Sequence, residues 1–244
     1  QNYNFSAKLV EAIGNLTLNG RNCAIGQFVA SGDGNVIING TSLTIGDGVA
    51  EEDRVYQALG SKNVTVDLDG GAFNASAGSI ENKSTGTMSI KAGAITAQYI
   101  TNESNLGNMN IHATSLTLTG ADPISGASFV NKGNFVGEVS GATELTNGFD
   151  LSSMGAANSF SLTTGTLSLG AGIDTFYDNN LASFVVNITN GALNANTIRN
   201  GYSNANANMG LSSAVSMAAD GIFAVGGVMG LSAPTIRPNR KSAG

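Results

Sequence analysis

The chain repeats a short pattern in which one polar residue stands between two apolar residues, and glycine or asparagine follows. Alternation of this kind, bounded by turn-forming residues, is typical of strands that bury one face. The sequence therefore predicts a protein built mainly from short strands. The clearest triplets are Leu16-Thr17-Leu18, Leu43-Thr44-Ile45, Val64-Thr65-Val66, Met88-Ser89-Ile90, Met109-Asn110-Ile111, Leu116-Thr117-Leu118, Phe160-Ser161-Leu162 and Leu167-Ser168-Leu169.

The spacing of these triplets indicates how the strands are arranged. Several come in pairs whose centres are seven residues apart, and the first triplets of successive pairs recur every 21 to 28 residues. A period of this length is typical of a solenoid, in which each coil lays its strands on those of the coil before. We therefore predict an all-β fold, a β-solenoid of about seven irregular coils. The leading centres are Ile37, Thr65, Ser89, Asn110, Val136, Ser161 and Val186.

A second all-β architecture fits the same strands. The coil lengths are uneven, and a β-sandwich or jelly roll that exchanges strands between subunits also consists of short alternating strands. Either fold needs turns, and asparagine followed by glycine favours turns with positive φ. Such pairs stand at Asn19-Gly20, Asn39-Gly40, Asn147-Gly148, Asn190-Gly191 and Asn200-Gly201.

Two segments resemble the coils of a known group of proteins. Residues 79–93, SIENKSTGTMSIKAG, and residues 129–135, FVNKGNF, are similar to the repeats of filamentous-haemagglutinin-type secreted adhesins. The resemblance implies a right-handed β-helix and an extracellular protein. The low charge and the abundance of Asn, Ser, Thr and Gly also resemble bacterial or archaeal surface-fibre proteins.

The pattern predicts one all-β domain over residues 1–233, followed by a basic tail over 234–244. Residues 1–20 are expected to form an N-terminal cap or joining segment. Within it, Phe5, Leu9, Val10 and Ile13 have the spacing of a short amphipathic helix, with an edge strand as the alternative. Residues 46–60 are expected to be an acidic insertion with one helical turn. Residues 202–233 are expected to be an apolar C-terminal segment.

Composition excludes several classes of function. Eleven Lys and Arg against seventeen Asp and Glu give a net charge of −6, which leaves too few cations for nucleic-acid binding. Cys23 is the single cysteine, so an intramolecular disulfide is excluded, and we expect its thiol to be buried. No apolar run is long enough for a membrane span.

Candidate chemistry is sparse, and we expect no enzyme and no cofactor. The single histidine, His112, should point outward from its strand without ligating partners. The cations Lys62, Lys83, Lys91 and Lys132 are too widely spaced for a catalytic cleft. The acidic residues between 47 and 69 suit Ca²⁺, which prefers several oxygens. A calcium site there would use Asp47, Glu51, Asp53, Asp67 and Asp69.

The remaining interpretation is assembly. We expect a non-catalytic, secreted structural protein that polymerises with copies of itself into a cell-surface filament, pilus-like fibre or sheath, since open sheet edges recruit further strands. Gln1 in place of Met is typical of a mature protein whose signal peptide was removed. The alternative is an adhesin rod that binds glycans or a host surface. The expected assembly interface comprises Phe5, Leu9, Met209, Met217, Phe223, Met229, Arg237, Arg240 and Lys241.

Overall fold

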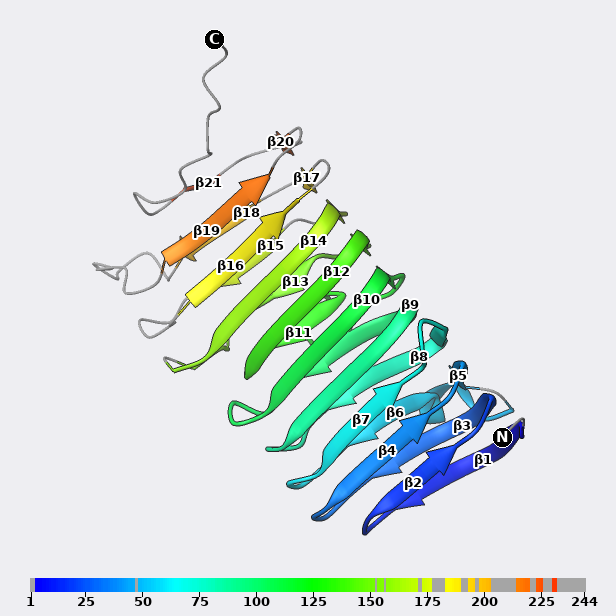
Figure 1. The fold of residues 1–244 in the computed structure, drawn as a ribbon. Coiled ribbons are helices and arrows are strands. Elements are labelled where there is room, and N and C mark those ends of the chain that lie inside the picture. The colour runs from blue at the N-terminus through cyan, green and yellow to red at the C-terminus, as the bar shows by residue number, and fades with distance from the viewer. Residues whose placement is uncertain are drawn as a thin grey trace.

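In the computed structural model the chain forms a rod of stacked parallel strands (Figure 1). Every strand pairing between described residues is parallel, as in a β-solenoid, whereas a β-sandwich or jelly roll would pair its strands antiparallel. The predicted solenoid is confirmed, and the sandwich alternative is wrong. The structure describes residues 3–46, 48–151, 153–155, 157–170, 173–176, 183–189, 193–195, 198–202, 214–219, 223–225 and 230–231.

Each coil contributes strands to three sides of the rod. The first side stacks β2 (Leu16–Asn19), β4 (Asn35–Asn39), β7 (Asn63–Asp67), the start of β9 (Thr87–Asn102), β10 (Asn108–Leu118), β12 (Asn134–Leu145), β14 (Ser159–Leu169), β16 (Ser183–Ile188) and β19 (Ala214–Ala219).

The second and third sides share several long strands that bend from one side to the next. The second side stacks β1 (Phe5–Ala12), β3 (Asn22–Ala30), β5 (Ser42–Ile45), β8 (Ala72–Asn82), the later parts of β9, β10, β12 and β14, then β17 (Leu193–Ala195) and β20 (Phe223–Val225). The third side stacks the ends of β1 and β3, β6 (Val55–Ala58), the ends of β8 and β9, β11 (Phe129–Asn131), β13 (Phe149–Asp150), β15 (Ile173–Phe176), β18 (Ile198–Tyr202) and β21 (Gly230–Leu231).

The predicted register is confirmed along most of the first side. The leading centres from Ile37 to Ser161 lie opposite one another in successive coils. The last centre is displaced by one residue, because Ser161 lies opposite Val185 and not Val186. The flanking apolar residues point inward, as alternation requires, and form one continuous core along the rod.

Aromatic side chains pack against one another in two parts of the core. Phe129 contacts Phe135 at a centroid distance of 4.7 Å, and Phe135 stacks on Phe160 at 4.8 Å. Nearer the N-terminus, Phe28 stacks on Tyr56 at 4.6 Å. Such contacts add to the free energy gained by burying the rings themselves.

The expected helix at residues 5–13 is wrong. The alternative, an edge strand, is confirmed: residues Phe5–Ala12 form β1 and pair with β3, because a strand here satisfies the backbone groups at the edge of β3, which a helix would leave unpaired. The helical turn in the acidic insertion is confirmed as the 3-10 helix η1 (Glu51–Asp53). Among the described residues, no helix is long and apolar enough to span a membrane.

The expected role of the Asn-Gly pairs is mostly wrong. Gly148 has positive φ, whereas Gly20 and Gly40 do not. Gly40 is required for a different reason, since a Cβ there would lie 2.6 Å from the carbonyl oxygen of Gly20 in the coil below. Gly201 continues β18 instead of turning, and Gly191 lies outside the described residues.

Candidate functional site

The acidic insertion interrupts the passage from the second side of the rod to the third, which is one unbroken strand in the neighbouring coils. β3, β8 and β9 each run from the second side to the third as one strand. In the coil between β3 and β8, β5 ends at Ile45 and β6 begins at Val55, and the connection between them contains the 3-10 helix η1. Loops outside a repeating scaffold are the usual carriers of binding groups.

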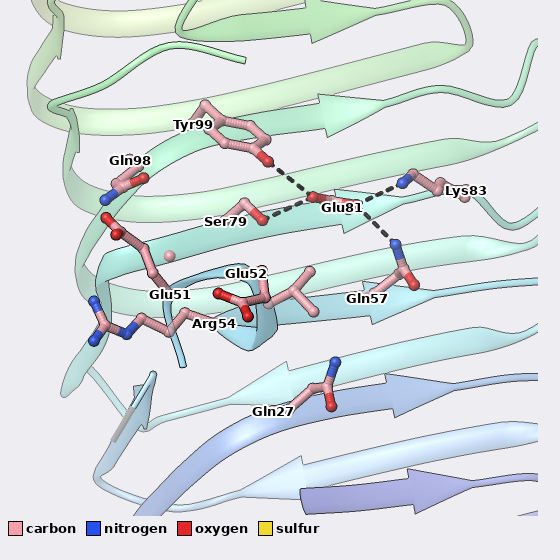
Figure 2. A pocket seen from close by; sticks show the side chains of 12 residues that line it. Gln27, Glu51, Glu52, Arg54, Gln57, Ser79, Glu81, Lys83, Gln98 and Tyr99 are labelled. Atoms are coloured by element: carbon pink, nitrogen blue, oxygen red, sulfur yellow. Dashed lines mark hydrogen bonds and ion pairs between the residues drawn. The ribbon is translucent and has the colours of Figure 1, made fainter. Parts of the chain in front are cut away.

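Beside this insertion lies a hollow of about 370 Å³ on the third side of the rod. Figure 2 shows outward side chains of successive coils lining it, with the insertion at one edge. We call it the Glu81 hollow. Its lining residues are Gln27, Glu51, Glu52, Arg54, Val55, Gln57, Gly78, Ser79, Glu81, Lys83, Gln98 and Tyr99.

The carboxylate of Glu81 is the best-anchored group of the hollow, and it is almost completely buried. One oxygen, Oε1, accepts hydrogen bonds from Ser79 Oγ at 2.8 Å and from the Tyr99 hydroxyl at 3.1 Å. The other, Oε2, accepts from Gln57 Nε2 at 2.8 Å and lies 2.8 Å from Lys83 Nζ. Figure 2 shows these four contacts converging from three neighbouring strands.

These contacts decide the charge of Glu81. Burial by itself raises the pKa of the carboxyl, but the hydrogen bonds from Lys83, Ser79 and Gln57 and the charge of Lys83 outweigh it, so the pKa is lowered. For Lys83, burial lowers the pKa, and the contact with Glu81 outweighs this and raises it. Burial raises the pKa of Tyr99. Near neutral pH the hollow therefore contains a fixed carboxylate paired with an ammonium group.

Other lining groups keep their hydrogen-bonding capacity. Between the lining residues, no hydrogen bond involves the side chains of Gln27, Gln98 or Glu52 (Figure 2). Arg54 donates from Nε to the carbonyl oxygen of Val49 at 3.4 Å, which holds the guanidinium against the insertion. The hollow thus combines an anchored centre with unused donors and acceptors around it.

A second hollow of about 360 Å³ lies on the first side. Its ionisable residues form a row across four coils, Asp67, Lys91, His112 and Glu138. Lys91 Nζ lies 3.1 Å from Asp67 Oδ2, and His112 Nδ1 lies 3.1 Å from Glu138 Oε2. His112 does point outward as predicted, although it has an acidic neighbour that the sequence analysis did not foresee.

The residues expected to bind calcium are spread over two connections. Glu51 and Asp53 belong to η1, between β5 and β6, whereas Asp67 and Asp69 lie at the connection from β7 to β8. The carboxylate of Asp67 is occupied by Lys91 and by the backbone N–H of Asp69, which lower its pKa. Asp47 lies outside the described residues. No three His, Cys, Asp or Glu side chains gather as a metal site in the described part of the chain.

The residues expected at an assembly interface divide between the two ends. Phe5 and Leu9 lie on β1, and Leu9 is 51% exposed. Met217 is in β19, opposite Val186, and Phe223 is in β20, opposite Leu193. Met209, Met229, Arg237, Arg240 and Lys241 lie outside the described residues. Cys23 is buried in the core, as expected, and burial raises the pKa of its thiol.

The Glu81 hollow was missed in the sequence analysis. A usable signal was present, since Gln27, Gln57 and Glu81 are polar residues one coil apart within strands of a chain that has few charges. These residues can be recognised as neighbours only when it is known which residues of each coil form the third side. Comparison of the chain with protein-family models, with curated proteins and with solved structures finds no match.

Proposed function

We propose that this protein is a non-catalytic extracellular structural subunit that polymerises end to end into a cell-surface filament or sheath. The observation that supports the proposal most is the outer edge of the first coil. Among the described residues, β1 pairs only with β3 and β2 only with β4, so one backbone edge of each strand has no partner. Unpaired strand edges are templates for another chain.

The side chains at this edge also suit a partner. Phe5, Val10, Leu16 and Leu18 pack against the core but are only partly buried, because no described coil covers their outer side. Tyr3 and Ile13, beside them, are 71% and 72% exposed. An apolar cross-section of this kind is stabilised when another apolar surface covers it.

A second copy of the chain is the occupant that fits this edge best. A coil of the same protein presents the same three parallel strands and the same inward rows, so it can continue the stack at the spacing between strands, about 4.8 Å. Contact between one end of a subunit and the other end of the next is heterologous and propagates as a filament. The acidic insertion and the basic residues Arg237, Arg240 and Lys241 have opposite charges, which favours the same head-to-tail orientation.

The experiment compares polymer growth of the 244-residue chain with that of a variant with two charges on the open edge, Leu9→Lys with Ile13→Lys. Sedimentation velocity and negative-stain microscopy measure the polymers. We expect the parent chain to form filaments and the double variant to stay monomeric. The control is Ile124→Lys, which replaces a 93% exposed apolar residue between β10 and β11 and should polymerise like the parent.

Two results would contradict the proposal. A parent chain that remains monomeric at about 100 μM, a concentration at which contacts with micromolar Kd are largely occupied, would exclude self-assembly of this chain. Polymers of unchanged length from the double variant would show that the first coil is not the joint.

A further inference from the structure

We propose that the Glu81 hollow binds an uncharged saccharide, with Gln27, Gln98 and Glu52 bonding its hydroxyl groups and Tyr99 contacting its ring. This activity goes beyond the proposed polymerisation and does not depend on it. The hollow is on the third side of the rod, whereas the open edge is at the end of the rod. A filament built end to end would therefore repeat the site along its length.

The unused groups of the hollow match the chemistry of sugar hydroxyls. A hydroxyl both donates and accepts a hydrogen bond, an amide side chain offers both roles, and a carboxylate accepts. Gln27 and Gln98 supply amides from different coils, and Glu52 supplies a carboxylate from the insertion. These three side chains border one hollow and make no hydrogen bond with its other lining residues (Figure 2).

The anchored carboxylate of Glu81 orients the ring of Tyr99, which would contact the sugar. The Tyr99 hydroxyl is tied to Glu81 at 3.1 Å, and that carboxylate is in turn held by Ser79, Gln57 and Lys83. The half-buried phenol ring of Tyr99 is therefore fixed before a ligand arrives. Preorganised groups lose little freedom on binding, and a fixed aromatic ring offers an apolar surface with a polar rim.

Charge selects against other ligands. The lining carboxylates Glu51, Glu52 and Glu81 outnumber the cations Arg54 and Lys83, and Lys83 is already paired with Glu81. An anionic ligand would therefore meet excess negative charge. A metal ion is disfavoured because both oxygens of Glu81 already accept hydrogen bonds from side chains.

Size and position agree with a small polar ligand. A volume of about 370 Å³ is at the lower end of the range for ligand pockets, which is roughly 300–1,000 Å³. The coil stack holds one wall in place, and the insertion forms the other. A short saccharide segment would enter from the open side of the hollow without displacing a strand.

The test is calorimetric titration of the 244-residue chain with maltose, cellobiose, lactose and chitobiose, and with glucuronic acid as the anionic comparison. We expect at least one of the neutral disaccharides to bind with one-to-one stoichiometry. Gln98→Ala and Tyr99→Ala should each weaken that binding at least tenfold. The control Asn110→Ala removes an exposed amide from the first side of the rod and should leave the affinity unchanged.

Any of three results would overturn the proposal. The first is that none of the four neutral disaccharides binds with a Kd below about 10 mM. The second is an unchanged affinity in Gln98→Ala, and the third is tighter binding of glucuronic acid than of every neutral sugar. The single variant Ile13→Lys at the open edge, which keeps Leu9 opposite the lining residue Gln27, should bind the saccharide as the parent does. Saccharide binding and polymerisation can therefore fail separately.

Discussion

The ammonium group of Lys62 lies inside the solenoid and donates a hydrogen bond to the carbonyl oxygen of Asp33, 2.6 Å away in the preceding coil. The same Nζ atom donates to the carbonyl oxygen of Gly14, one coil further, at 2.9 Å. Lys62 is 0% exposed, so one buried side chain satisfies backbone acceptors of two other coils at the same corner. A lysine that the sequence analysis treated as one of several scattered cations thus connects the first three coils.

Replacing Lys62 with Met should destabilise the protein by about 3 kcal/mol, because both carbonyl groups lose their donor within the buried corner. Chemical denaturation followed by circular dichroism measures the free energy of unfolding. The matched control is Lys91→Met, at an exposed ion pair with Asp67, where the loss should stay below about 1 kcal/mol. Equal losses at the two sites would contradict the role assigned to Lys62.

Tyr56→Phe should leave stability unchanged or raise it by up to about 1 kcal/mol. The hydroxyl of Tyr56 is buried without a hydrogen-bond partner, while its ring packs between Phe28 and Phe73. Removing an unsatisfied polar group eliminates the free-energy cost of its desolvation, and the ring contacts remain. Tyr99→Phe is the comparison and should destabilise by about 1 kcal/mol, because it removes the donor to Glu81. In thermal denaturation, the melting temperature should therefore stay unchanged or rise in Tyr56→Phe and fall in Tyr99→Phe.

Asn102→Leu should destabilise by about 3 kcal/mol, because it breaks a ladder of buried amides on successive coils. Asn102 accepts a hydrogen bond from Asn82 at 2.9 Å and donates to Asn131 at 2.7 Å. The control is Asn110→Leu, at an exposed position, where denaturant titration should show a change within about 0.5 kcal/mol. A small effect at Asn102 would mean that the corner tolerates an apolar residue.

Gly93→Ala should destabilise by 2 kcal/mol or more, roughly the cost of overpacking a rigid site. A Cβ at this position would overlap the carbonyl oxygen of Gly70 in the coil below. Gly14→Ala is the control, since nothing lies within 4 Å of its Cβ position. Melting temperatures should fall for the first variant only, because Ala in place of Gly by itself lowers the entropy of the unfolded chain and does not destabilise. An equal fall in both would contradict steric overlap at Gly93 as the cause.

Stability should fall in acid partly through Glu81. Hydrogen bonds outweigh the cost of burial and lower its folded-state pKa, so as the pH falls the unfolded chain takes up the proton first. The contribution of Glu81 is therefore complete above its ordinary pKa of 4.5 and is lost as the pH falls towards the lower folded value. Urea denaturation across this range should show a weaker pH dependence in Glu81→Gln. The same substitution at the exposed Glu144 should keep the dependence of the parent, and a parent-like slope in Glu81→Gln would contradict the assignment.

The sequence by itself determined the strand content, the parallel stacking and most of the register on the first side. Alternation fixes which residues point inward, and a recurrence of 21 to 28 residues fixes which strands meet, so Ile37, Thr65 and Ser89 could be aligned without a structure. The resemblance to secreted adhesins and the expectation of a polymer rest on composition and coil pattern, and they stay predictions.

Only the tertiary structure decided which side chains meet at the corners between the sides and on the third side of the rod. Glu81, Gln57 and Tyr99 meet because coils of different lengths bring them into register, and local alternation carries no information about that alignment. Gly40 and Gly93 are explained by backbone contact between coils and not by the turn chemistry of Asn-Gly. Lys62 and the asparagine ladder are buried for the same reason: their partners lie one or two coils away in space but 20 to 48 residues away in sequence.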